Sequence, residues 1–73
     1  MSTSFSYNRE IFRKNLKIAR KALGLSQKAI HEKTGIAASY VSDVERGTRN
    51  VTLDVATCLS EAVGQSLRRM LKP

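Results

Sequence analysis

The residues best able to do chemistry in this sequence are its cations. Lysine and arginine number 13 against six aspartates and glutamates, which gives a formal net charge of +7. The excess is concentrated in residues 9–33, where eight basic side chains accompany two acidic ones. Charge of this density favours a polyanionic partner, either a nucleic acid or an anionic membrane surface. The alternative from charge alone is a solvated basic face that binds nothing.

The other reactive side chains lack the partners that catalysis or metal binding requires. His31 and Cys58 are the single histidine and the single cysteine, so neither an intrachain disulfide nor a Cys/His zinc site can form. The sequence has no glycine-rich phosphate loop, and serines alone do not make a nucleophilic site. We therefore expect no enzyme activity, no metal and no cofactor. His31 should be exposed on a helix, and Cys58 should be buried as a small hydrophobic residue.

The chain length limits the number of domains, and the first residues indicate the cellular compartment. A chain of 73 residues has room for one domain, which is marginally stable unless a disulfide, a metal or self-association supports it. Residues 1–8 do not form a secretory signal, and no stretch is apolar enough to span a bilayer. We therefore expect a cytoplasmic protein that self-associates.

Apolar residues recur at helical spacing along the chain, and β alternation is not sustained anywhere. Glycines and serine or threonine N-caps divide this pattern into helices. The expected helices span residues 8–23, 27–33, 37–46, 53–63 and a short segment after Ser66 that reaches residue 71. The chain should therefore be an all-α domain over residues 9–73, preceded by a flexible N-terminal arm over residues 1–8.

The same spacing predicts which residues the helices bury. Leu23 should lie on the apolar face of the first helix, and Leu53 on that of the fourth. In the arm, Phe5 and Tyr7 could fold back over the domain as a hydrophobic lid.

The two short helices on either side of Gly35 form a helix-turn-helix unit. Its residues are the runs 25–30 (LSQKAI), 35–36 (GI), 39–42 (SYVS), 44–47 (VERG) and 48–53 (TRNVTL). These runs resemble the Cro/repressor-like helix-turn-helix family, and especially its restriction–modification controller proteins. The resemblance covers residues 12–67 and implies a five-helix, lambda-repressor-like fold. In that fold the second helix crosses the DNA backbone and the third enters the major groove.

The resemblance also implies a set of DNA-binding residues. Gln27 should clamp the DNA backbone from the start of the second helix, where backbone N–H groups can meet a phosphate. Helical spacing puts Ala38, Ser39 and Ser42 on an outward arc of the third helix, while Val41 and Val44 face inward. The outward arc should contact bases, and Tyr40 should either pack beneath this helix or contact a phosphate. The full set is Gln27, Lys28, Ala38, Ser39, Tyr40, Ser42, Asp43, Arg46, Thr48, Arg49 and Asn50.

The third helix departs from the family pattern at its start. Positions 37 and 38 are both alanine, where the family usually has a capping residue and a long polar reader. A missing N-cap costs about 1 kcal/mol, and methyl groups offer only apolar contact, most plausibly to thymine. The following loop can compensate, because Arg49 carries a guanidinium fork suited to phosphate or guanine. The resemblance further implies that Arg20 pairs with Glu45 and ties the first helix to the third.

The C-terminal segment predicts a homodimer. Leu67, Met70 and Leu71 fall at spacings of three and four and form one apolar stripe, unless they only close the core of the monomer. Two copies on a two-fold axis would read half-sites about 34 Å apart. The sequence therefore predicts a homodimeric, nucleoid-associated transcription regulator that binds specific duplex DNA and controls its own promoter or a neighbouring gene.

Two other functions remain open at this point. One is an antitoxin, in which a DNA-binding domain of this type also restrains a toxin partner. The other is a protein-interaction module that has lost DNA binding, an alternative that the alanines at positions 37 and 38 leave open.

Overall fold

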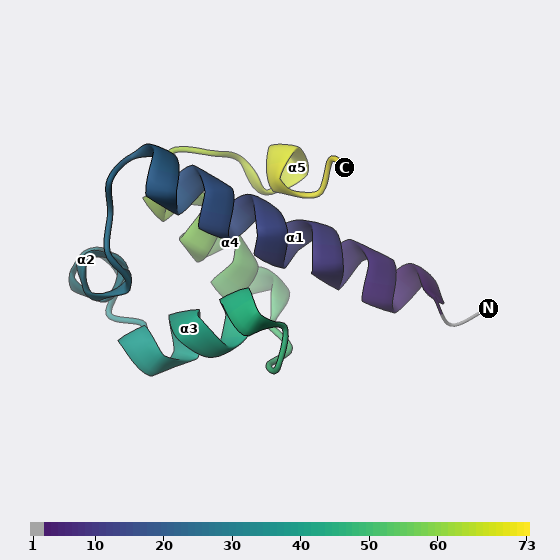
Figure 1. Cartoon of the computed structure of the whole chain (residues 1–73), viewed down its shortest axis with the longest axis horizontal. Coiled ribbons are helices and arrows are strands. Elements are labelled where there is room, and N and C mark those ends of the chain that lie inside the picture. The colour runs from purple at the N-terminus through teal and green to yellow at the C-terminus, as the bar shows by residue number, and fades with distance from the viewer. Residues whose placement is uncertain (1–2) are drawn as a thin grey trace.

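The protein is all-helical over the residues that its structure, a computed structural model, describes (Figure 1). These are residues 3–73 for the backbone and residues 8–73 for the side chains. The helices are α1 (Thr3–Ala22), α2 (Gln27–Thr34), α3 (Ala38–Arg46), α4 (Leu53–Ala62) and α5 (Leu67–Met70). The expected all-α fold is confirmed, and apart from the start of α1 the helix ends differ by about one residue from those expected.

The first helix begins at Thr3 rather than at residue 8, so the segment expected to be an arm is helical from Thr3 onward. The expectation placed the start of the helix where the helical apolar pattern begins, at residue 8. A helix that is already packed can extend outward without an apolar face, because each added residue gains a backbone hydrogen bond. The side chains of Phe5 and Tyr7 lie outside the described residues, as does any lid they would form. The mobility of this segment stays a prediction.

Local signals set the other helix ends. Ser26, Thr52 and Ser66 each accept a backbone hydrogen bond at the start of α2, α4 and α5, as expected. Ala37 makes no side-chain bond at the start of α3, so this helix does lack its cap. Between α2 and α3, Gly35 adopts a left-handed conformation with φ of 78°. That conformation closes the helix-turn-helix turn, and it is the one that glycine adopts most easily.

The core lies where the helices meet. Helix α2 packs against α3 and α4, while α1 packs against α3 and α5. The buried hydrophobic residues are Phe12, Leu16, Ile30, Val41, Val44, Ala56, Leu59, Ala62, Val63 and Met70. Burying each of the larger side chains contributes about 1.5–3 kcal/mol. Because these residues come from all the helices, the core fixes how α2 and α3 lie relative to α1.

Three burial predictions are wrong. Leu23 is 55% exposed and Leu53 is 72% exposed, because they lie at the end of α1 and the start of α4, beyond the cover of neighbouring helices. Cys58 is half-buried rather than buried. His31 is exposed as expected, and its Nδ1 lies 2.9 Å from the carbonyl oxygen of Ile36.

The C-terminal segment is anchored to α1. Asn15 donates hydrogen bonds from Nδ2 to the carbonyl oxygens of Met70 and Lys72, at 2.8 and 2.9 Å. Met70 is only 2% exposed and belongs to the monomer core, so its predicted place on an exposed interface stripe is wrong. Leu67 is half-buried and Leu71 is 39% exposed, which leaves Leu71 as the exposed apolar side chain of the predicted stripe.

Candidate nucleic-acid interface

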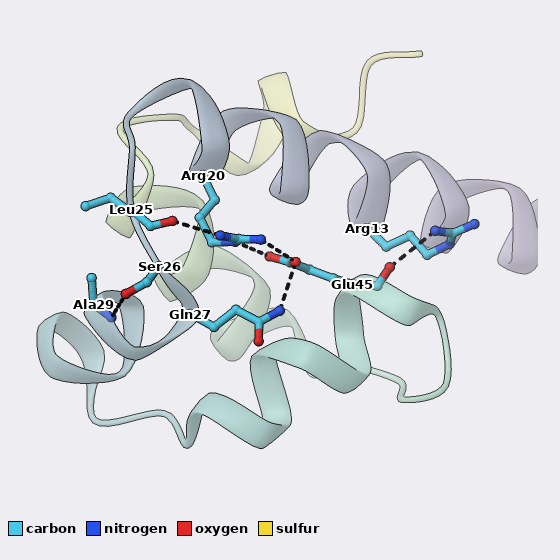
Figure 2. Close-up of polar contacts among 7 residues, drawn as sticks. All are labelled: Arg13, Arg20, Leu25, Ser26, Gln27, Ala29 and Glu45. Carbon is cyan, nitrogen blue, oxygen red and sulfur yellow. Dashed lines mark hydrogen bonds and ion pairs between the residues drawn. The ribbon is translucent and has the colours of Figure 1, made fainter.

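A buried ion pair fastens α3 to α1 (Figure 2). The carboxylate of Glu45 accepts hydrogen bonds from Nε of Arg20 at 2.7 Å and from its Nη2 at 3.0 Å. Arg20 also donates from Nη1 to the carbonyl of Leu25, at 2.8 Å. Hydrogen bonding to Glu45 raises the pKa of Arg20, so this guanidinium remains charged. The tie between Arg20 and Glu45 that the resemblance implied is confirmed.

Two more side chains reach Glu45 from other directions. Gln27 donates from Nε2 to Oε1 of Glu45 at 3.1 Å, and Arg13 donates from Nη1 to the main-chain carbonyl of Glu45 at 3.2 Å. Figure 2 shows both pointing toward the C-terminal part of α3. We call Arg13, Arg20, Gln27 and Glu45 the Glu45 cluster. Because its members come from α1, α2 and α3, the cluster sets the position of α3 from the inside.

At the start of α2, the clamp on the DNA backbone that is expected of Gln27 stays a prediction. The side chain of Gln27 turns inward to Glu45, a contact that the sequence alone did not indicate. The groups left to face a phosphate are the backbone N–H groups of Gln27 and Lys28, which precede the first intrahelical hydrogen bonds of α2. The exposed side chain of Lys28 adds a positive charge beside them.

The outward face of α3 carries only small side chains near its start. Ser39 is exposed, and Ala38 and Ser42 are half-buried beside it. Val41 and Val44 are buried on the opposite side, which confirms the expected division between the two faces. Small groups allow this helix to approach a duplex closely, but they can read few base edges.

A second cluster lies where α3 leads into the loop before α4. The carboxylate of Asp43 accepts from Nη2 of Arg46 at 2.7 Å and lies 3.7 Å from Nε of Arg49. We call Asp43, Arg46 and Arg49 the Asp43 cluster. Thr48 holds the loop against it, because its N–H and its hydroxyl both donate to the carbonyl of Asp43, at 3.0 and 3.1 Å.

The loop is also held by groups that sequence reasoning did not connect with it. The guanidinium of Arg49 lies 4.5 Å from the centre of the Tyr40 ring, and the Tyr40 hydroxyl donates to the carbonyl of Asn50 at 3.4 Å. Of the two roles expected for Tyr40, the structure has the packed one. From α1, Arg9 donates to the side-chain oxygen of Asn50.

Charge around this loop is strongly positive but partly paired. The side chain of Arg46 is 67% exposed and that of Arg49 is 49% exposed, while Asp43 is 30% exposed between them. On α1, Glu10 pairs with Arg13 at 2.6 Å, and this hydrogen bond holds the pKa of Glu10 below its ordinary value. The structure thus brings the predicted loop residues together and adds Arg9 and Arg13, whose positions depend on tertiary packing.

Comparison with known proteins assigns the fold and these residues to one family. A family model described as helix-turn-helix matches residues 16–69, which include both clusters except Arg13. The chain belongs to the helix-turn-helix family. As a member it is a DNA-binding regulator of transcription, as the resemblance implied.

Several proteins similar to this helix-turn-helix chain are named as control proteins, and one of them as a restriction–modification controller protein. It is 35% identical over 63 residues to the control protein C.SmaI of Serratia marcescens, covering 86% of this chain and 75% of that protein. Among solved structures, the restriction–modification controller protein C.AhdI of Aeromonas hydrophila superposes with a TM-score of 0.75 at 38% identity, covering 85% of this chain and 94% of that one. A hypothetical transcription factor from Neisseria superposes with a TM-score of 0.84 at 29% identity, covering 90% and 76% of the two chains. The antitoxin alternative gains no support from these names.

None of the helices in the described part of the chain combines the length and the hydropathy that crossing a bilayer requires.

Proposed function

We propose that this helix-turn-helix protein binds a specific duplex sequence as a homodimer and thereby controls transcription from its own promoter. The observation that carries the proposal is the placement of α3. The Glu45 cluster holds this helix from the inside, while Ser39 and its neighbours face outward beside the arginines of the loop. Relatives named as control proteins support a regulatory role on DNA.

The proposed contacts are of two kinds: some position the protein on the duplex, and others read its base sequence. The start of α2, with Lys28, meets the phosphate backbone and sets the register of the protein on the duplex. Helix α3 then offers methyl and hydroxyl groups to bases, which gives modest discrimination. Arg49 supplies the stronger contact, because a guanidinium can form two parallel hydrogen bonds with guanine or a phosphate.

Selection of bound sequences from a random duplex pool tests this proposal most directly. A binding motif should emerge, and it should be recovered from the region upstream of the protein's own gene. The logarithm of the affinity should fall by about 0.9 for each phosphate contact per unit of log salt concentration. Recovery of no motif, or an affinity insensitive to salt, would refute sequence-specific DNA binding.

Replacing Arg49 by alanine tests whether the loop before α4 contacts DNA. If its guanidinium reads guanine, affinity for the selected duplex should fall by roughly 5- to 150-fold, the equivalent of about 1–3 kcal/mol. Lys14→Ala is the matched control, because it removes an exposed positive charge from α1 outside the proposed interface. Equal losses in the two variants would show that Arg49 contributes only net charge.

The proposed dimer uses an apolar groove at the C-terminal side of the domain. The groove measures about 620 Å³ and lies between α1, the loop before α4, and α5. Phe12, Val51 and Leu67 are among its lining residues, as are the exposed side chains of Leu53 and Leu71. A second copy would cover these leucines, and the two recognition helices would then read half-sites about one turn of duplex apart.

Sedimentation equilibrium at tens of micromolar tests the dimer. The wild-type chain should be dimeric, and Leu71→Asp should shift it toward monomer without loss of helicity. Ile18→Asp is the matched control, because Ile18 is 66% exposed on α1 and lies outside the groove. A wild-type monomer that also binds the selected duplex as a single copy would refute the dimer and leave DNA binding intact.

Control of its own promoter has a separate test. The upstream region of the gene is fused to a reporter, and the protein is supplied from a second promoter. Reporter output should change with the protein level, and it should not change when the selected motif is scrambled. An unchanged output would refute autoregulation alone.

A further inference from the structure

The Asp43 cluster places a negative charge where the proposed interface needs positive ones. Asp43 lies on the recognition helix α3, one turn beyond Ser39. A duplex presents closely spaced phosphates, and a carboxylate at that position repels them. Asp43 therefore opposes binding unless its charge has another use within the interface.

The contacts of Asp43 indicate what that use is. Its carboxylate accepts from Arg46 at 2.7 Å and lies 3.7 Å from the guanidinium nitrogen of Arg49. The side chain of Arg46, at the end of α3, is 67% exposed and that of Arg49, in the loop, is 49% exposed, so both guanidinium groups can reach a duplex. A carboxylate and a phosphate offer a guanidinium the same kind of partner, a pair of anionic oxygens.

We infer that Asp43 is a specificity-determining residue that competes with DNA phosphates for Arg46 and Arg49. This inference rests on the proposed function. On non-specific DNA, a phosphate would have to displace the carboxylate that repels it, so the arginines stay paired with Asp43 and gain little. On the correct sequence, the guanine acceptors carry no charge, so a guanidinium can bind them through its remaining N–H groups while it stays paired with Asp43. Asp43 thus weakens binding to wrong sequences more than binding to the right one.

The neighbouring residues make the competition effective. Tyr40 lies against the guanidinium of Arg49, which restricts where that group can move. Thr48 is bonded to the main-chain carbonyl of Asp43 and not to its carboxylate, so the loop keeps its anchor when the side chain is changed. The carboxylate can therefore be altered without dismantling the loop.

The test compares Asp43→Asn with the wild type on two duplexes. One is the duplex recovered by selection with the wild-type protein, and the other is a scrambled duplex of the same length and composition. Fluorescence anisotropy gives both affinities over a salt series, and circular dichroism verifies that each variant is folded. Asp54→Asn is the matched control, because it removes the same charge from an exposed position in the first turn of α4.

Asp43→Asn should bind the scrambled duplex about three- to tenfold more tightly, a range set by the energies of two exposed ion pairs. Its salt dependence on that duplex should steepen by about 0.9 for each arginine that gains a phosphate contact. The ratio of selected to scrambled affinity should fall at least threefold. Asp43→Glu should keep the ratio close to the wild-type value, and Asp54→Asn should change both affinities by the same small factor.

Three results would overturn the inference. A ratio that is unchanged in Asp43→Asn would remove any role in specificity. A ratio that falls only because binding to the selected duplex weakens would make Asp43 a direct base reader, for example toward the amino group of cytosine. A ratio in Asp43→Glu as low as that in Asp43→Asn would assign the effect to side-chain shape rather than charge. A wild-type protein with no preference for the selected duplex would instead refute the proposed function.

Discussion

Replacing Glu45 by leucine should remove a large part of the stability of this domain. The change deletes the acceptor of three side-chain hydrogen bonds, two from Arg20 and one from Gln27. It also leaves Arg20, whose side chain is only 10% exposed, without its counter-charge. Breaking a buried pair in this way costs about 3–5 kcal/mol. A domain of 73 residues has roughly 4–11 kcal/mol of stability in total, so the variant should be close to unfolding at 25 °C.

Urea and thermal unfolding, followed by circular dichroism, measure this loss. At about 4–8 °C for each kcal/mol in a domain of this size, the melting temperature should fall by roughly 12–40 °C. Glu61→Leu makes the same chemical change at an exposed position of α4 and should alter stability by no more than about 0.5 kcal/mol. The double variant Arg20→Met with Glu45→Leu should recover most of the loss, because no buried charge is then left unpaired.

Two outcomes would refute this reasoning. A cost below about 1 kcal/mol for Glu45→Leu would mean that solvent reaches Arg20 and that the pair behaves as a surface ion pair. A double variant no more stable than the single one would mean that the Glu45 cluster contributes shape or hydrogen bonds, and that charge pairing is not its main role.

Three further changes have predictable effects on stability, each measured by urea unfolding. Gly47→Ala should cost about 1–2 kcal/mol, because φ is 79° there and the new Cβ would meet the Arg13 side chain at 3.0 Å; no loss would contradict the left-handed turn. Ala37→Ser should stabilise the protein by about 0.5–1 kcal/mol, since it supplies the N-cap that α3 lacks; destabilisation would show that position 37 cannot act as a cap. Met70→Asp should unfold the monomer, because Met70 is 2% exposed in the core; a variant that is a folded monomer would instead support Met70 as a residue of the dimer interface.

Most helix ends could be predicted from the sequence because their causes are local. Ser26 and Thr52 cap the helices that follow them, and Gly35 reverses the chain by its own backbone conformation. Each of these effects depends on residues within one turn, so spacing and residue type are sufficient. The extension of α1 to Thr3 could not be predicted in this way, because it follows from outward growth of a packed helix.

Predictions that depended on tertiary packing were less successful. Leu23 and Leu53 follow the apolar spacing of their helices but lie beyond the cover of the core, whereas Met70 is buried within it. Periodicity identifies an apolar face without saying which neighbouring helix covers it. The tie between Arg20 and Glu45 came from family resemblance alone, since nothing local connects residues so far apart.

The same distinction between local causes and tertiary packing applies to the candidate site. The outward position of Ser39 could be predicted from helical spacing, which also placed Val41 inside. The inward turn of Gln27 could not, because it depends on where α2 and α3 lie in space. The pair of Asp43 with Arg46 has a local cause, since the two residues are three apart on one helix, and its spacing could have indicated it.

The Glu45 cluster has a consequence for how this domain can diverge. It orients α3 through residues that face inward, while Ala38, Ser39 and Ser42 face outward and take no part in it. Under the proposed function, orientation and sequence preference are therefore encoded by different residues. A duplicated gene could acquire a new operator through a few substitutions on the outer arc, with no compensating change in the interior. Related domains should consequently diverge in their target sequences faster than in their fold.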